Sequence, residues 1–461
     1  MDASTCPGCC QRDARIAELE RRVAELEARL GTNSSNSSVP PSANPLGAPK
    51  PVVKKKSKRK PGGQPGHPPR LKQLLPPERV NRVIPLVPHE CEDCHADLPT
   101  EPAADDPEPT RFQTIELPRV VAFVTEYQGH ARTCACCGHV TRAVIPADIR
   151  AHSVGPRLTA ALSYFTGNHG LSKRGVEEIA ENLFDAPVAL GTVANLEQEV
   201  SAALAPAHQE ALAAVRAAAV KHADETSWKL MGKLRWLWAA ASLGVVVFVI
   251  HAKRSALGLA ALLGEEITGI LCSDRWSVYN CVPAARRQIC WAHLKRDFQK
   301  IIDGGGVSAF VGCQGRRLVK KVFAAWHEFQ DGQCTRAQLQ ERLAPVMRSM
   351  NLVLIEGWLG ADKTVASFCG NLLELESALW TFVTTDGVEP TNNFIERLLR
   401  RAVLWRKRSF GCWSEAGCRF VERILTVVQT RRLQGKNALD YLHDAVLAHR
   451  AGKPCPKLLP E

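Results

Sequence analysis

The sequence predicts an α/β protein with a mixed central sheet, and three observations support this fold class. An alanine-rich stretch that ends near Ala219 gives way to Trp-, Val- and Ile-rich runs over residues 234–243 and 245–252. Gly244 separates these two runs, which is typical of antiparallel strands joined by a tight turn. A helical run over residues 256–263 then leads into further strand-like runs, at 269–274 and 288–293.

A strand that begins at Val220 precedes the two apolar runs. Three strands, a helix and a fourth strand follow the order of the ribonuclease H-like fold, so we expect a ribonuclease H-like catalytic core. Asp224 shares a strand face with His222, and Asp274 shares one with Cys272, because side chains alternate along a strand. Adjacent central strands would bring the two aspartates together, where they repel unless cations bind between them. This favours a metal site over a packing role.

A third acid is expected from a late helix. Apolar residues at 394, 395, 398, 399, 402 and 403 indicate a buried stripe. Asn392, Glu396 and Arg400 follow one another at a spacing of four on a neighbouring face. We therefore expect Glu396 to be the third metal ligand. The alternative is that Glu396 forms an ordinary surface ion pair with Arg400.

Three carboxylates of this kind suit phosphoryl transfer. Two Mg²⁺ ions (or Mn²⁺) roughly 3.5–4 Å apart activate an attacking water or 3′-hydroxyl and stabilise the leaving oxygen. Cations and Trp405 follow Glu396 closely and fit strand binding by charge and stacking. The predicted DNA-binding residues here are Arg397, Arg400, Arg401, Arg406, Lys407 and Arg408.

The whole chain has 461 residues, a net charge of +12 and a pI near 9.0. The length suggests roughly two to four domains, and the charge indicates a polyanionic partner. Its longest apolar run, residues 237–250, is too short to span a bilayer. The N-terminus lacks a basic-then-apolar secretory signal, so we expect a cytoplasmic protein without membrane contact.

The N-terminal segment predicts self-association and a DNA-binding arm. Residues 13–30 carry apolar side chains at alternating steps of three and four, the pattern of a coiled coil. The alternative is a short amphipathic helix packed on its own protein. A Ser-, Asn- and Pro-rich linker at 31–51 is predicted to be disordered. The basic run that follows is either a solvated tail or an arm that lies along DNA, and its cations are Lys54, Lys55, Lys56, Lys58, Arg59 and Lys60.

Two CxxC pairs predict a structural zinc site. The chain has 17 cysteines, and without an export signal paired cysteines favour metal ligands over disulfides. Cys91 and Cys94 precede a strand-like run at 120–127, and Cys134 and Cys137 follow it. Four thiolates suit tetrahedral Zn²⁺. Cys136 is a spare, a redox CxxC is the weaker alternative, and the pair at positions 6 and 9 stays unassigned.

Residues 151–218 predict a helical DNA-binding region. Helical patterns over residues 172–182 and from Gly191 to Val200 flank a break at 185–187, as in a helix-turn-helix. Any all-helical domain contains such pairs, however. Glu197 and Glu199 on the second helix count against its deep insertion into a groove.

Seven stretches in this order resemble transposases of the insertion sequence 66 family, over almost the full length of the chain. They are NSSNSSVPPSA, RKPGGQPGH, HADETSW, DRWSVY, QICWAHLKRDF, VEPTNNFIERLLR and RKRSFGCWSEAG. The resemblance implies a bacterial DNA transposase with a zipper-like N-terminus, a zinc-binding module and a DDE catalytic domain. Its triad falls on Asp224 of HADET, Asp274 of DRWSVY and Glu396 of NNFIER.

Two further details follow from the resemblance. Cys290 and His293 resemble the CxxH element that follows the second aspartate in several transposase lineages. His293 is therefore expected near the active site, in contact with DNA, although a core histidine at a strand end is the alternative. Arg275 and Trp276 depart from the small turn residue that commonly follows the aspartate, which puts the geometry of this loop in doubt.

The predicted organisation has seven parts. They are a coiled-coil helix (1–30), a linker and basic arm (31–80), a zinc-binding module (81–150), a helical DNA-binding region (151–218), the first part of the core (219–300), a helical insertion (301–385) and a C-terminal catalytic helix and tail (386–461). We expect binding to double-stranded DNA, both terminal repeats and target, by a homo-oligomer with small accessory proteins. The alternatives are an inactive or repurposed transposase that only binds DNA, and a structure-specific nuclease.

Overall fold

In this computed structural model, residues 15–23, 74–101, 103, 104 and 106–460 are described. The chain divides into two compact units, one of Met1–Pro49 with Val121–Glu461 and the other of Lys50–Val120. Among the described residues, no helix is both long and apolar enough to cross a membrane.

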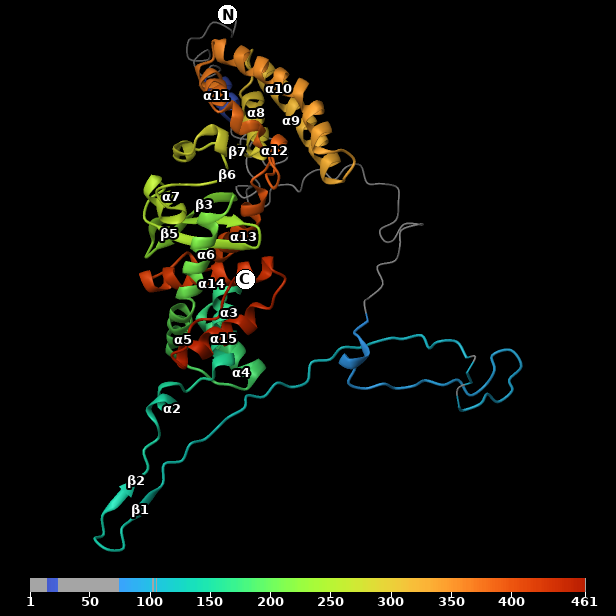
Figure 1. Cartoon of the computed structure of the whole chain (residues 1–461), viewed down its shortest axis with the longest axis vertical. Helices are drawn as coiled ribbons and strands as arrows, with labels where there is room; N and C mark the ends of the chain where they lie inside the picture. The colour runs from blue at the N-terminus through green and yellow to red at the C-terminus, as the bar shows by residue number, and fades with distance from the viewer. Residues whose placement is uncertain (1–14, 24–73, 102, 105, 461) are drawn as a thin grey trace, which may run out of the picture. The chain divides into compact units, whose positions relative to one another are not determined.

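A five-stranded mixed sheet forms the centre of the larger unit (Figure 1). Its strands are β3 (Val220–Leu230), β4 (Lys233–Ser242), β5 (Val245–His251), β6 (Ile270–Ser273) and β7 (Arg287–Ile289). Their order across the sheet is β5-β4-β3-β6-β7. The first three strands are antiparallel, whereas β6 and β7 run parallel to β3. This confirms the predicted α/β class with a mixed sheet.

Local chemistry explains the antiparallel meander. Met231 and Gly232, between β3 and β4, both have positive φ, at 49° and 75°. Two left-handed residues in a two-residue turn match the right-handed twist of the strands that they join. Gly244, between β4 and β5, also has a positive φ of 77°. The predicted strand at 288–293 is wrong in its second half, because β7 ends at Ile289 and a helix begins at Trp291.

Helices cover both faces of the sheet and extend beyond it. One face of β4 and β5 packs against α6 (Ala205–Ala217) and α7 (Ala256–Leu263). Helix α14 (Glu415–Leu433) runs along the edge of β5, and α15 (Ala438–Arg450) packs against α14. The opposite face packs against α13 (Asn393–Ser409). Alternate residues of β4 face opposite ways: Ala240 joins the first cluster and Ala239 the second.

Two groups of helices complete the unit. A small bundle before the sheet consists of α3 (Pro156–His169), α4 (Lys173–Phe184) and α5 (Leu190–Ala203). Between β7 and α13 lie α8 (Trp291–Gly304), α9 (Ala309–Gln330), α10 (Arg336–Leu359), α11 (Lys363–Glu374) and α12 (Glu376–Thr384). These five helices share a core of their own with β6 and β7 (Figure 1).

Helix α14 supplies acceptors to the edge strand β5. Glu422, Thr426 and Thr430 accept hydrogen bonds from the backbone N–H groups of residues 250, 248 and 246. Four helical residues rise about 6 Å, close to the length of about 6.6 Å that two strand residues span. The matched spacing lets one helix face satisfy the donors of the strand edge, which would otherwise invite pairing with another chain.

The described residues before α3 have little regular structure. They contain η3 (Pro77–Arg79), β1 (Ala131–Thr133), β2 (Val140–Arg142) and α2 (Ala147–Ala151). The predicted strand at 120–127 is wrong, because residues 120–127 pair with no described strand and their apolar side chains are mostly exposed. Residues 15–23 are helical, with Ile16, Leu19 and Val23 exposed. The coiled coil itself stays a prediction.

Candidate active site

Asp224 and Asp274 come from adjacent parallel strands. The β3–β6 register pairs Val220 with Ile270 and His222 with Cys272. The same offset, continued past the end of β6, places Asp224 beside Asp274. Both side chains are half-buried, so the structure brings together the two acids that strand alternation predicts at one end of the sheet.

The two carboxylates lie in an electrostatically unfavourable place. Burial raises the pKa of Asp224 well above its usual range, and the negative charges of Glu225, Asp274 and Glu396 raise it further. Asp224 Oδ1 accepts a hydrogen bond of 2.8 Å from the Glu225 amide, and Asp274 Oδ1 accepts one of 3.0 Å from the Trp276 amide. Within the described part of the chain, neither forms an ion pair with a cationic side chain. A bound cation would relieve this repulsion.

Glu396 lies on α13, and Asn392 fixes the start of that helix. The buried Asn392 amide donates to the Ala223 carbonyl (2.8 Å) and its Oδ1 is 3.0 Å from His222 Nδ1. Its backbone N–H donates to Cys290 Sγ (3.1 Å), and its carbonyl accepts from the Glu396 N–H. These contacts tie α13 to β3 one turn before Glu396. The half-buried Glu396 is therefore held within electrostatic range of Asp224.

Cys290, His293 and Glu396 form a second cluster beside the acids. Their potential ligand atoms all lie within 4.8 Å of one another, and His293 Nδ1 is 3.6 Å from Glu396 Oε1. Both of these atoms are buried without a hydrogen-bond partner. His293 lies in the first turn of α8, which corrects the strand-end alternative. Burial lowers its pKa, as does the charge of Arg296, whereas Glu396 and Asp274 oppose this shift.

Glu225, the residue after Asp224, is held by neighbouring side chains beside the acids, and no role was predicted for it. Glu225 is 2% exposed and accepts hydrogen bonds from Tyr279 Oη (2.7 Å) and from the Arg254 guanidinium (2.6 and 2.8 Å). The guanidinium lies 4.0 Å from the centre of the Trp276 ring, a cation–π contact. Burial raises the pKa of Glu225. The unusual Trp276 thus completes a stack beside the acids, and its amide also caps Asp274.

A buried cation lies next to Asp274. Arg287, on β7, is fully buried and donates to the Asp274 carbonyl (3.2 Å) and to Asn280 Oδ1 (2.8 Å). Burial lowers the pKa of this guanidinium, and the negative charge of Asp274 opposes the shift. The positive charge of Arg287 therefore lies on the buried side of the acidic cluster.

The predicted cations of α13 divide into two groups. Arg406 donates to Thr226 Oγ1 (3.0 Å) and Ser227 Oγ (2.5 Å), so its guanidinium ties α13 to β3. The others have exposed side chains: Arg397, Arg400, Arg401, Lys407 and Arg408. Arg408 also donates to the His169 carbonyl at the end of α3 (3.0 Å). The DNA-binding role stays a prediction for all six. The basic run from Lys54 to Lys60 lies outside the described residues.

The predicted zinc ligands occupy two loops with matching local geometry. Backbone N–H groups of Cys94 and Asp93 lower the pKa of the Cys91 thiol, and those of Cys137 and Cys136 lower that of Cys134. Each loop also has a positive-φ residue just after the second cysteine, His95 in one and Gly138 in the other. Amides directed at sulfur are what a metal-bound thiolate requires. Cys91 and Cys94 belong to the compact unit Lys50–Val120, and Cys134 and Cys137 belong to the other unit. The cysteine pair at positions 6 and 9 lies outside the described residues.

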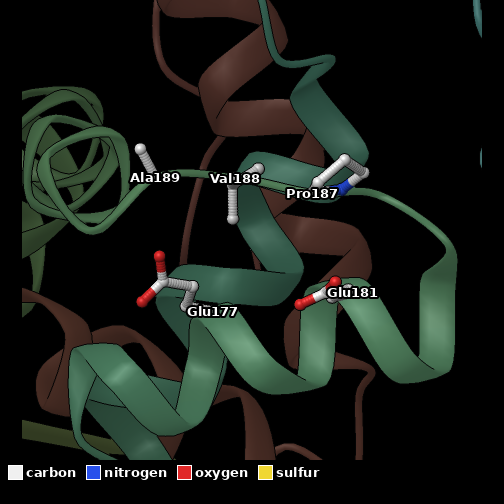
Figure 2. Close-up of a pocket in the computed structure, with 5 residues that line it drawn as sticks. All are labelled: Glu177, Glu181, Pro187, Val188 and Ala189. Carbon is white, nitrogen blue, oxygen red and sulfur yellow. The ribbon is translucent and has the colours of Figure 1, made fainter.

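The helix pair α4–α5 presents acid rather than base near its turn. Figure 2 shows Glu177 and Glu181 of α4 lining a pocket with Pro187–Ala189. On α5, Glu197 pairs with Lys173, and Glu199 accepts from Arg450 at 2.7 and 2.9 Å. The two α5 acids are therefore paired with cations of α4 and α15, whereas the acidic pocket disfavours phosphate. The helix-turn-helix role stays a prediction.

Comparisons with known proteins agree with the sequence resemblance. A family model described as "Transposase IS66 family" matches residues 151–419, which include Asp224, Asp274 and Glu396. Residues 11–72 match a "Family of unknown function (DUF6444)". The uncharacterized protein y4qI of Sinorhizobium fredii (strain NBRC 101917 / NGR234) is 27% identical over 251 residues, 48% of this chain and 45% of that protein. The matched region thus spans less than half the length of this relative. Since the first family model covers more than half of the chain, the protein belongs to the IS66 transposase family.

Proposed function

We propose that the chain is an active DDE transposase that binds the ends of its insertion sequence and cleaves and transfers DNA strands. The observation that carries the proposal is the placement of Asp224 beside Asp274 by the β3–β6 register. Glu396 reaches the same charge cluster from α13. The sheet order β5-β4-β3-β6-β7 supports a ribonuclease H-like core.

The three acids fit the divalent cations that the family implies. They supply hard oxygen ligands, the ligands that Mg²⁺ prefers and Mn²⁺ also accepts. Burial raises the pKa of Asp224 and like charges raise it further, and Glu396 Oε1 is buried without a hydrogen-bond partner. Bound Mg²⁺ would polarise the scissile phosphate and lower the pKa of the attacking water or 3′-hydroxyl.

The remaining residues of the site position the acids. Asn392 holds the start of α13 against β3, and Trp276 holds one oxygen of Asp274. Arg287 supplies buried positive charge close to Asp274, and the exposed Arg254 pairs with the buried Glu225 carboxylate. This pre-organisation limits rearrangement of the carboxylates during strand cleavage. His293, next to Glu396, would contact the DNA strand that enters the site.

We further propose how DNA is delivered to the acids. The exposed arginines and lysines of α13 would bind duplex phosphates of the terminal repeats and of target DNA. The basic arm at 54–60 would add contacts, and a Zn²⁺ module of Cys91, Cys94, Cys134 and Cys137 would shape the N-terminal region. A homo-oligomer formed through residues 1–30 would bring two ends together, with small accessory proteins of the same element.

Strand cleavage of the element's own ends tests this function. Wild-type protein is expected to cleave them with Mg²⁺, and Asp224→Asn is expected to bind the same DNA without cleavage. Glu265→Gln is the matched control, because Glu265 is an exposed acid after α7. Robust cleavage by Asp224→Asn would refute the metal triad. Tight binding without cleavage by the wild type would favour the alternative, a repurposed transposase that only binds DNA.

A further inference from the structure

Three apolar side chains protrude together from one end of the β3–β4 hairpin. Phe410 is 72% exposed and Trp413 is 78% exposed, and both lie in the connection between α13 and α14. Met231, in the β3–β4 turn, is 59% exposed. The two segments are adjacent, because Leu230 pairs with Cys412 in an isolated parallel bridge. We call Met231, Phe410 and Trp413 the aromatic rim.

The backbone beneath the rim is fixed. Cys412 donates to the Lys229 carbonyl and accepts from the Met231 N–H, both at 2.8 Å. A Cβ at Gly411 would lie 2.2 Å from the Lys229 carbonyl oxygen, so only glycine permits this approach. Phe410 adopts a left-handed φ of 60°, a costly conformation for a bulky residue that persists where the surroundings enforce it. The fold thus holds two large aromatic side chains in solvent.

The surroundings of the rim are strongly basic. The two segments 226–236 and 405–415 contain six cationic residues and a single acid, Glu415. The cations are Lys229, Lys233, Arg235, Arg406, Lys407 and Arg408. Within the described chain none of the six forms an ion pair with an acid, and Arg406 instead donates to Thr226 Oγ1 of β3. This charge fits a polyanion, whereas three side chains are far fewer than the 20–30 residues a side (roughly) of a stable protein interface.

We propose that the aromatic rim contacts the bases of the DNA duplex whose strand is cut at the acids. This inference rests on the proposed transposase function and assigns a second DNA contact to it. Asp224 and Leu230 lie on one strand, six residues apart, which corresponds to about 20 Å. At about 3.4 Å for each base pair, the rim meets the duplex about six base pairs from the scissile phosphate. Basic neighbours hold the backbone while the apolar side chains press between base steps and unstack them.

Two variants of the full-length protein test the rim without disturbing the core. Trp413→Ala removes an exposed ring, and Phe410→Asn keeps a residue that tolerates the left-handed conformation. Leu243→Ala is the matched control, because Leu243 is 98% exposed in the β4–β5 turn, at the other end of β4. The probe is a duplex that carries the terminal sequence of the element. Dissociation constants and the permanganate reactivity of thymines along the duplex are measured for each protein.

The wild type and Leu243→Ala are expected to make thymines about six base pairs from the cleavage site reactive. Each rim variant is expected to abolish this reactivity and to weaken binding about 5- to 100-fold. If the wild type cleaves the duplex and both rim variants keep its DNA affinity and thymine reactivity, the rim proposal alone is overturned. A wild type that neither binds nor cuts the duplex would overturn the proposed function with it. The wild type could also form a dimer that Trp413→Ala converts to a monomer while thymine reactivity stays unchanged. This result would assign the rim to a protein contact and overturn the proposal.

Discussion

Replacement of Asn392 by alanine tests how α13 presents Glu396. The Asn392 side chain is 1% exposed and bonds to both the Ala223 carbonyl and His222 Nδ1. Burial lowers the pKa of His222, so the neutral imidazole carries one N–H, which donates to Asn392 Oδ1 when it is on Nδ1. Alanine would leave this N–H and the Ala223 carbonyl buried without partners.

The expected cost follows from these two orphaned groups. Each buried polar group left unsatisfied costs about 1–3 kcal/mol, so Asn392→Ala should lower the free energy of unfolding by roughly 2–6 kcal/mol. Because Asn392 precedes Glu396 by one helical turn, the loss should also displace that carboxylate. We expect a lower kcat for strand cleavage with little change in DNA affinity, since no phosphate-binding cation is removed.

Urea unfolding and single-turnover cleavage measure the two effects. Asn393→Ala is the matched control, because Asn393 is the exposed neighbour at the start of the same helix. Asn392→Asp is a second test: it keeps an acceptor for His222 but sets a carboxylate oxygen against the Ala223 carbonyl. If Asn392→Ala unfolds and cleaves like Asn393→Ala, the reasoning about the α13 anchor is refuted.

Three other predictions concern charge and metal. Asp224→Asn should stabilise the metal-free protein, because it removes a carboxylate whose charge is disfavoured by burial and by its like-charged neighbours, and it should abolish stabilisation by Mg²⁺. Thermal unfolding with and without Mg²⁺ measures both effects, and an unchanged Mg²⁺ effect would contradict the assignment. Burial raises the pKa of Glu422 to about 7 in the folded protein. Its contribution to the free energy of unfolding is therefore greatest below its ordinary pKa of about 4.5. This contribution falls by about 3 kcal/mol as the pH rises from about 4.5 to about 7, and it is constant above about pH 7. Glu422→Gln should remove this slope in urea unfolding at pH 5 to 8, and parallel pH profiles would refute the buried carboxyl. Cys91→Ser should lose its zinc in elemental analysis whereas Cys136→Ser keeps it; equal zinc in both would exclude Cys91 as a ligand.

Strand alternation was enough to predict how Asp224 and Asp274 lie. Asp224 and Asp274 each lie two residues after the paired residues His222 and Cys272. Because side chains alternate along a strand, residues two apart in the sequence lie on the same face. The helix limits of α7 were also predictable, because its apolar run is bounded by Ser255 and Gly264. Such local patterns need no knowledge of distant contacts.

Features that depend on long-range partners were not predictable in this way. The apolar run at 120–127 resembles a strand, yet it lacks a described pairing partner. Glu225 looks like a solvent-facing neighbour of Asp224, but Arg254 and Tyr279 enclose it from later segments. Trp276 seemed to disturb the loop after Asp274, whereas its amide caps that aspartate. In each case the deciding contact comes from the tertiary structure.

The same principle explains how Glu396 can follow a long helical insertion without losing its position. The insertion leaves the sheet at Cys290, whose N–H donates to the Ser273 carbonyl of β6 (2.9 Å). It returns at Pro390 and Asn392: Trp291 N–H donates to the Pro390 carbonyl (2.9 Å), and Asn392 N–H donates to Cys290 Sγ (3.1 Å). The residues at which the insertion begins and ends are therefore hydrogen-bonded to each other next to the acids. Because this junction closes the loop, the helices between its ends can vary in length while Glu396 keeps its place, so chain separation from Asp274 carries no information about the site.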